Sequence, residues 1–180
     1  MNRRDLLAAG AAVAAGGGEA AKAAAPPELK PGLEFEFRAV VTLGPVIEQG
    51  TWDGLRRRIV PITGGTVEGV RFKGKVLPGG ADWQSLSTAD GLTQIYARYT
   101  LQHDDGTIVG VINPGVRRGP AEVMARLAAG ETVDPAAYYF RASPQFEVQP
   151  GAHRWLAENT FVCVGKRWPA SVELDIYRVL

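Results

Sequence analysis

The chain has 180 residues, of which 46% are hydrophobic and 22% charged, so it is neither disordered nor fibrous, and this length fits one domain. The 20 basic and 19 acidic residues nearly balance, so no polybasic field is available to hold a nucleic acid or an anionic membrane. A single cysteine excludes an internal disulfide framework and a thiolate-rich metal site. The 22 glycines and 12 prolines favour short strands and turns over a helix bundle.

The N-terminal segment predicts export. Arg3 and Arg4 precede an uncharged run of Leu, Ala, Val and Gly at residues 6–18, which is too short to span a bilayer. An arginine pair followed by Asp-Leu-Leu is typical of a twin-arginine signal. An ordinary amphipathic helix is the alternative, but the run has no polar face.

A cleavage site is expected soon after this run. Ala21 and Ala23 stand at an Ala-x-Ala spacing, which predicts cleavage after Ala23. We therefore expect a signal peptide at residues 1–23, a linker at 24–32 and a β-barrel domain at 33–180. The mature domain would be periplasmic, and the export machinery would be a partner of the signal peptide.

Alternating apolar and polar residues predict an all-β domain. At residues 33–43 every odd position is apolar, which is the two-residue period of a strand with one buried face. The other expected strands occupy residues 56–62, 66–77, 92–102, 107–113, 138–142, 161–164 and 172–179.

Turn signals separate these strands. Gly64-Gly65 and Pro78-Gly79-Gly80 are expected to end strands, and Asp104-Asp105-Gly106 is expected to form a hairpin turn. One short helix is predicted between Pro120 and Gly130. About eight short strands with one helix favour a sandwich or a closed antiparallel barrel.

The chain resembles an uncharacterised bacterial family. The resemblance is carried by Arg-Arg-Arg-Ile-Val-Pro-Ile-Thr-Gly-Gly at residues 56–65 and by Leu-Pro-Gly-Gly-Ala-Asp-Trp-Gln at residues 77–84. Shorter matching pieces lie at residues 97–99, 104–106 and 138–141. This pattern is similar to domain of unknown function family 3237, also called uncharacterised protein family 0311. The resemblance implies a lipocalin-like or allene-oxide-cyclase-like β-barrel with no established activity.

Motifs for metal, nucleophilic or phosphate chemistry are sparse. His103 lies beside the hairpin turn and is expected to be solvated, while His153 is expected in a loop. Cys163 lies in an apolar strand and is interpreted as a small buried hydrophobe. Because a zinc site needs three or four converging ligands, we predict no metal and no cofactor.

Charged residues on apolar strand faces indicate a candidate site. Glu68 shares a face with Phe72 in the strand expected at residues 66–77, and Arg58 lies on an apolar face of the preceding strand. A buried carboxylate must be paired or its pKa rises, which suits a general acid or base. We interpret Glu68 as a candidate catalytic group with Arg58 or Arg178 as its possible partner. A one-residue slip in the strand would instead place Glu68 outside the barrel.

Further candidates surround the expected barrel mouth. Asp82, a second catalytic candidate, and Trp83 are placed in a loop that covers or plugs the barrel end. Tyr99, on the apolar face of its strand, joins Arg58, Trp83, Asn113 and Arg141 as a candidate ligand-binding residue.

Three functions fit these observations. The first is a barrel that binds a small, partly apolar molecule. The second is a cofactor-free isomerase, cyclase or lyase that uses a barrel-lining carboxylate, and the third is a structural module with a filled barrel. Partners would be a small-molecule ligand and possible further copies of the chain, with no nucleic acid and no membrane span.

The export hypothesis makes a direct prediction. Replacing both Arg3 and Arg4 by lysine should leave the precursor in the cytoplasm, because the twin-arginine route depends on that pair. Cell fractionation followed by N-terminal sequencing measures the outcome. Normal export of the double variant would contradict the assignment.

Overall fold

The computed structural model describes residues 30–180. The predicted signal peptide and its cleavage position after Ala23 lie outside the described residues. No helix within residues 30–180 is long and apolar enough to cross a membrane.

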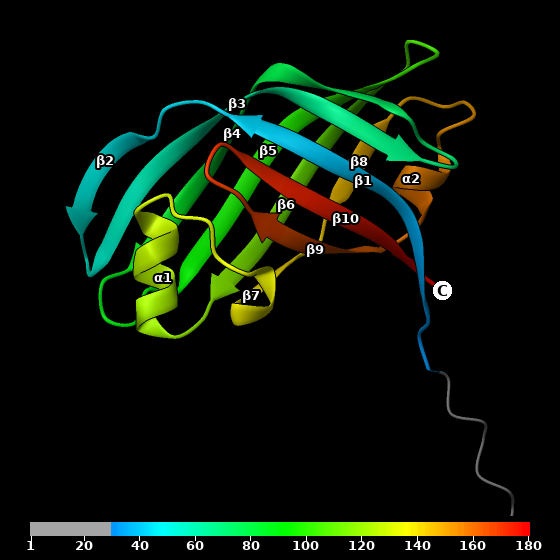
Figure 1. Cartoon of the computed structure of the whole chain (residues 1–180). Coiled ribbons are helices and arrows are strands. Elements are labelled where there is room, and N and C mark those ends of the chain that lie inside the picture. The colour runs from blue at the N-terminus through cyan, green and yellow to red at the C-terminus, as the bar shows by residue number, and fades with distance from the viewer. Residues whose placement is uncertain (1–29) are drawn as a thin grey trace, which may run out of the picture. The chain divides into compact units, whose positions relative to one another are not determined.

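Antiparallel strands close into an eight-stranded barrel, as predicted (Figure 1). Its strands are β1 (Leu33–Leu43), β3 (Leu55–Gly69), β4 (Gly74–Ser87), β5 (Thr93–His103), β6 (Ile108–Arg118), β7 (Tyr139–Ala142), β8 (Gln145–Val148), β9 (Phe161–Arg167) and β10 (Ser171–Val179). β7 and β8 pair with successive parts of β6 and share one position. The barrel closes because β1 pairs with β10 on one side and with β3 on the other. A further strand, β2 (Ile47–Trp52), pairs only with β3.

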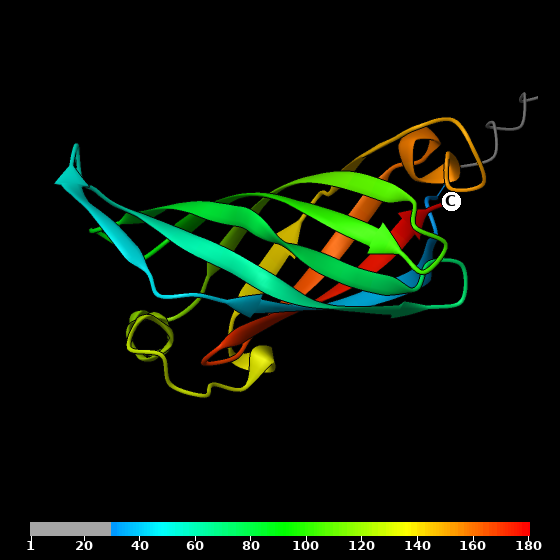
Figure 2. The same ribbon diagram turned by 90° about the horizontal axis from the view of Figure 1, so that it is seen from above.

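Two short helices lie at opposite ends of the barrel (Figure 1, Figure 2). The predicted helix is confirmed as α1 (Ala121–Ala128), which follows Pro120 and buries Met124 and Leu127. The second helix, α2 (Trp155–Glu158), was not predicted because one turn of four residues carries no apolar periodicity. Below, the α1 end and the α2 end name the two ends of the barrel.

Phenylalanine side chains fill the α2 end. The rings of Phe37 and Phe72 lie 5.4 Å apart, and those of Phe146 and Phe161 lie 5.0 Å apart. Phe37 also contacts Phe146 at 6.0 Å, and Leu156 of α2 is buried in the same cluster. These distances are typical of packed aromatic pairs, so this half of the barrel is a solid core.

The prediction of a single strand at residues 66–77 is wrong. β3 ends at Gly69 and β4 begins at Gly74, so this stretch is a hairpin between two strands. Val70 is fully exposed at its tip, while Phe72 folds back into the core. In the sequence, the apolar residues on both sides of this four-residue connection continue one alternating pattern, so the two strands were predicted as one.

Two glycine pairs bend strands rather than end them. β3 continues through Gly64-Gly65 with a register shift, and β4 continues through Pro78-Gly79-Gly80 with another. A Cβ at Gly65 would lie 2.0 Å from the carbonyl oxygen of Val40, and both glycines of the first pair have positive φ. The expectation that these glycines form turns is therefore wrong, because they act as bulges in a strongly curved sheet.

The core predicts a difference between neighbouring aromatic residues of β1. Phe37 is 1% exposed, whereas Phe35 is 48% exposed against Tyr177. Phe37→Ala should reduce the free energy of unfolding by about 3–5 kcal/mol, because it opens a cavity in the phenylalanine cluster. Phe35→Ala should cost about 1 kcal/mol. Urea denaturation measures both, and equal losses would contradict the inward assignment of Phe37.

Candidate functional site

Polar and charged side chains occupy the α1 end of the barrel lumen. Arg58 on β3 and Gln84 on β4 face each other across paired strands, and both are buried. The Arg58 Nε donates to Gln84 Oε1 at 2.9 Å, and Gln84 Nε2 donates to Asp82 Oδ2 at 2.5 Å. The backbone N–H of Tyr96 donates to the other carboxylate oxygen at 3.1 Å. With Arg117 of β6, these residues form what we call the lumen cluster: Arg58, Asp82, Gln84 and Arg117.

Burial shifts the pKa values of this cluster. Desolvation raises the pKa of Asp82, although the hydrogen bond from Gln84 and the charge of Arg117 act in the opposite direction. Desolvation lowers the pKa of Arg58. It also lowers the pKa of Arg117 to about 10, with further contributions from the charges of Arg58 and Arg167. The guanidinium groups of Arg58 and Arg117 therefore act on one carboxylate, and this end of the lumen carries an excess of positive charge.

Arg117 stands out because its guanidinium has few partners. The residue is 3% exposed, and its Nε has no hydrogen-bond partner within the described part of the chain. Its nearest aromatic contact is the ring of Phe140, 5.9 Å from the guanidinium carbon. Buried polar groups normally find partners, so this one indicates a position that a ligand oxygen can occupy.

Two spaces flank the lumen cluster. The larger, which we call the mouth pocket, measures about 390 Å³ and lies beneath α1. Its lining includes Leu86, Gly91, Thr93, Arg117, Met124 and Ala125. The smaller, the lumen cavity, measures about 40 Å³ and is lined by Asp82, Gln84, Tyr99 and Asn113 together with apolar residues. The lumen cavity has room for a few water molecules, whereas the mouth pocket has the size of a small-molecule site.

The Tyr99 hydroxyl and the Cys163 thiol keep their protons because both side chains are buried. Desolvation raises the pKa of Tyr99 and raises the pKa of the Cys163 thiol to about 12. Both groups are therefore protonated at neutral pH, and Cys163 is a buried residue, as predicted, rather than a thiolate nucleophile. Asn113 lies beside them, and its Oδ1 has no partner among residues 30–180.

Four of the candidate residues from the sequence gather at this site. Arg58, Asp82, Tyr99 and Asn113 come from four neighbouring strands, β3 to β6, and all belong to the lumen cluster or line the lumen cavity. Asp82 lies within β4 and not in a loop as expected, because the strand continues past Gly80.

The other three candidates lie elsewhere. The Glu68 side chain is 63% exposed and pairs with Lys73 at 3.2 Å, so its expected place among lumen residues is wrong. The bulge at Gly64-Gly65 shifts the inward positions of β3 by one residue, so the Glu68 side chain points out of the barrel. Trp83 is exposed on the outer wall and does not lie at the mouth. Arg141 also faces outward, with its guanidinium 5.1 Å from the ring of Tyr139.

Gln84, Arg117 and Arg167 are site residues that the sequence interpretation missed. Arg117 has the same parity as Val109, Val111 and Asn113, so it lies on the inward face of β6. The signal was present, but the strand was expected to end at Asn113 because Pro114 follows. The register shows Pro114 inside the strand, opposite Tyr96.

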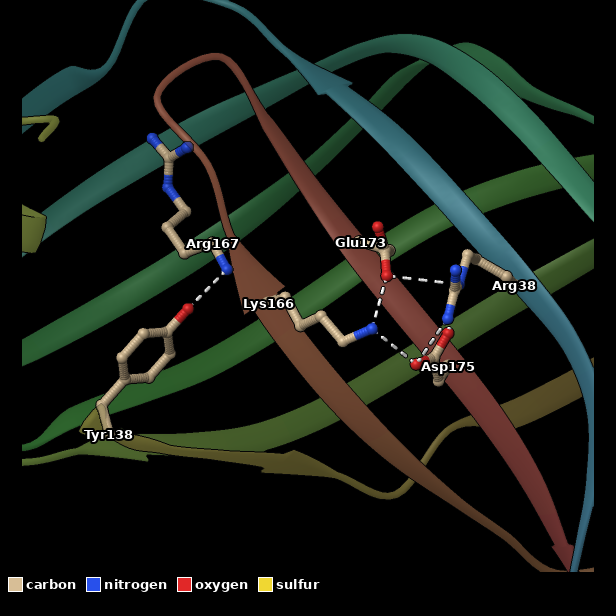
Figure 3. Close-up of polar contacts among 6 residues, drawn as sticks. All are labelled: Arg38, Tyr138, Lys166, Arg167, Glu173 and Asp175. Atoms are coloured by element: carbon tan, nitrogen blue, oxygen red, sulfur yellow. Dashed lines mark hydrogen bonds and ion pairs between the residues drawn. The ribbon is translucent and has the colours of Figure 1, made fainter. Parts of the chain in front are cut away.

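A second group of charges lies on the outer wall and joins three strands (Figure 3). Asp175 of β10 accepts from Arg38 Nε of β1 at 2.5 Å and from Lys166 Nζ of β9 at 2.9 Å. Burial would raise the pKa of Asp175, but these hydrogen bonds bring it below its ordinary value. Glu173 also contacts Lys166 at 2.5 Å. Because every charge has a partner, this group ties the strands together and leaves no group available for a ligand.

The fold and the site define a small closed antiparallel β-barrel, with an aromatic core at one end and a cationic lumen at the other. Residues 31–179 match the family described as "Protein of unknown function (DUF3237)". The chain belongs to this family, as the resemblance predicted.

Relatives from bacteria support the assignment. A UPF0311 protein of Clostridium acetobutylicum is 42% identical over 124 residues, covering 69% of this chain and 78% of its own. A UPF0311 protein of Rhodopseudomonas palustris is 38% identical over 154 residues, covering 84% of this chain and 100% of its own. A solved structure of a beta-barrel like protein from Acinetobacter baumannii has a TM-score of 0.74 at 40% identity, covering 87% of this chain and 99% of that one.

A fungal protein is also similar. The hydroalkoxylation enzyme of Penicillium herquei is 38% identical over 78 residues, which is 42% of this chain and 50% of the fungal one. A solved structure of an enzyme from the same fungus has a TM-score of 0.65 at 20% identity, covering 87% of this chain and 99% of that chain, and this likeness concerns the fold alone.

Proposed function

We propose that the barrel binds a small, partly apolar anion in the mouth pocket, with the anionic oxygen of the ligand on Arg117. The observation that carries this proposal is a buried guanidinium whose Nε has no hydrogen-bond partner among residues 30–180, at the edge of a pocket of about 390 Å³. Binding pockets for small molecules typically measure about 300–1,000 Å³ and combine apolar walls with a few polar groups.

The charge balance favours an anion over a neutral ligand. Arg58, Arg117 and Arg167 contribute three positive charges near one carboxylate, and burial already lowers the pKa of Arg117 to about 10. A carboxylate or phenolate oxygen would pair with the planar guanidinium in two hydrogen bonds. Leu86 and Met124 would pack against the hydrocarbon part of the same molecule.

A purely structural role is less well supported. The phenylalanine cluster alone closes the α2 end, so the polar residues at the α1 end are not needed to fill the barrel. Burying arginine side chains without carboxylate ion pairs among the described residues costs stability, and a module selected only for stability would carry apolar residues there.

The location of this activity is a separate proposal. The twin-arginine pattern at residues 1–23 supports export of the barrel, which would then meet its ligand in the periplasm. The barrel would bind the ligand by the same contacts in either compartment.

The anion proposal predicts a preference between two probes of nearly equal shape. The full chain should bind 2-naphthoate at least about tenfold more tightly than the uncharged 2-naphthamide, because only the former pairs with Arg117. Arg117→Met should abolish that preference while leaving the melting temperature unchanged or higher, since it removes a desolvated charge. Isothermal titration calorimetry and thermal melting measure both effects.

The neighbouring arginine provides a matched control. Arg118 is exposed, with its guanidinium 4.9 Å from the ring of Tyr139 on the outer wall. Arg118→Met should keep the preference for 2-naphthoate. Equal binding of the two probes by the parent chain, or a preference that survives Arg117→Met, would contradict the proposal.

Proton transfer by Asp82 is the second candidate function. Two observations favour it: desolvation raises the pKa of Asp82, and this carboxylate lies on the wall of the lumen cavity beside Gln84. A carboxyl group with a raised pKa is suited to general acid–base catalysis near neutral pH. The fungal relative adds support, because hydroalkoxylation adds an O–H group across a carbon–carbon double bond and requires two proton transfers.

A substrate of this kind is larger than the lumen cavity, so it would have to extend from the mouth pocket past Arg117 to reach Asp82. The lumen cluster then suggests how such an addition would proceed. Asp82, as the carboxylate, takes the proton of the attacking hydroxyl while its oxygen forms the new C–O bond. The electron pair of the double bond moves onto a conjugated carbonyl oxygen, where the charge of Arg117 stabilises the enolate. The α-carbon of the enolate then takes up a proton from the protonated Asp82, which restores the carboxylate.

This candidate predicts a catalysed model reaction. The chain should accelerate the cyclisation of 2′-hydroxychalcone to flavanone, and Asp82→Asn should reduce that acceleration at least about tenfold, within the range contributed by general acid–base groups. Absorbance of the chalcone follows the reaction. Glu68→Gln removes an exposed carboxylate outside the lumen and should leave the rate unchanged. No acceleration above the spontaneous rate, or an unchanged rate in Asp82→Asn, would exclude a role for this carboxylate in this reaction.

A further inference from the structure

Three side chains with metal-binding atoms converge at the α2 end of the barrel. His103 is the last residue of β5, Asp105 lies in the turn that follows, and His153 lies just before α2. His103 Nδ1 is 3.0 Å from one oxygen of Asp105, and His153 Nε2 is 2.9 Å from the other. All three ligand atoms lie within 4.8 Å of one another, so residues 48 positions apart in the chain meet at one point.

A cation among these atoms would relieve a repulsion between two of them. His103 Nδ1 lies 3.1 Å from the backbone N–H of Asp105, which it can accept only through an unprotonated lone pair. An unprotonated nitrogen and a carboxylate oxygen 3.0 Å apart repel each other. A proton on Nδ1 or a metal ion bound to its lone pair would each relieve this repulsion, and in both cases the backbone N–H of Asp105 would no longer donate to Nδ1.

The histidine rings are held in place by packing. The imidazoles of His103 and His153 lie 4.1 Å apart, and both contact the buried ring of Phe72 at 5.1 and 5.5 Å. His153 is 7% exposed, and its Nδ1 has no partner within the described residues. An imidazole ring that is fixed in orientation presents its Nε2 toward Asp105 without further loss of rotamer freedom.

We propose that His103, Asp105 and His153 form a binding site for a divalent transition-metal ion such as Zn²⁺. Two imidazole nitrogens and one carboxylate oxygen are a ligand set that zinc, nickel and cobalt accept, whereas magnesium and calcium prefer oxygen ligands. A tetrahedral ion with bonds of about 2.0–2.2 Å keeps its ligand atoms about 3.5 Å apart. The two ligand atoms that lie farthest apart in this group would therefore move about 1 Å closer together on binding. The Asp105 side chain is 47% exposed, which leaves a fourth position open to water.

The consequence is a link between two distant parts of the chain. The ion would join the β5–β6 turn to the segment that positions α2 over the phenylalanine cluster. This site is at the end opposite the lumen cluster, so it is independent of the proposed function, and it stands as an alternative to the expectation that the chain carries no metal site. The expectation that His103 is solvated is wrong, because its side chain is 20% exposed and its ring contacts those of Phe72 and His153.

The parent chain allows a direct test. Because the sequence contains only two histidines, their ring-proton NMR signals can be assigned without ambiguity when no histidine tag is present. Addition of Zn²⁺ should shift both sets of signals, saturate at one ion per chain by calorimetry and raise the melting temperature. Unchanged signals from both histidines would overturn the proposal.

Substitutions give an independent readout. Asp105→Asn and His153→Gln should each weaken Zn²⁺ binding at least about tenfold and remove the rise in melting temperature. Asp104→Asn is the matched control, because Asp104 is adjacent but its carboxylate is outside the group of three ligands. Zinc binding that is equal in all variants would place the ion elsewhere and overturn the proposal. If one of the variants fails to fold, the NMR titration of the parent chain still decides the question.

Discussion

The barrel depends on the pairing of β1 with β3, which converts a curved sheet into a closed surface. β1 pairs with β10 on its other edge, so this single contact removes both open edges of the eight-stranded sheet. The backbones approach closely at glycines: a Cβ at Gly69 would lie 2.3 Å from the carbonyl oxygen of Glu36, and one at Gly65 would lie 2.0 Å from that of Val40. Closure forces alternate residues of every strand inward, where there is no water to solvate a charge.

This constraint produces two different interiors in one barrel. At the α2 end the inward positions hold Phe37, Phe146 and Phe161, and Phe72 folds back from a hairpin to complete the core. At the α1 end the inward positions hold Arg58, Asp82 and Arg117. The apolar end supplies the stability that lets the other end carry desolvated charges, as binding and catalytic sites commonly require.

The two proposed sites use opposite ends and different chemistry. The lumen cluster has more cations than anions, so it fits an anionic molecule against Arg117 and a proton transfer at Asp82. The histidine group fits a cation and joins the β5–β6 turn to the segment before α2. Since they share no residue, loss of one site leaves the argument for the other unchanged.

Sequence alone determined the class of fold, the inward face of β10 and of β1 from Phe37 onward, the helix after Pro120 and the family, because each depends on a local pattern or on a contiguous motif. The bulge between Phe35 and Phe37 leaves Leu33 and Phe35 exposed, against the alternation of residues 33–43. Sequence also named Arg58, Asp82, Tyr99 and Asn113 as site candidates, with Arg58 and Tyr99 placed by the parity of their own strands and Asp82 by a loop that was expected there. Only the tertiary structure showed where the inward-facing positions of a strand shift by one residue. The bulge at Gly64-Gly65 turns the Glu68 side chain out of the barrel, and β4 continues through Gly80, so that Asp82 lies inside. The tertiary structure also decided the meeting of His103 with His153 and the isolation of Arg117, because contacts between residues far apart in the chain arise only when the strands close on one another.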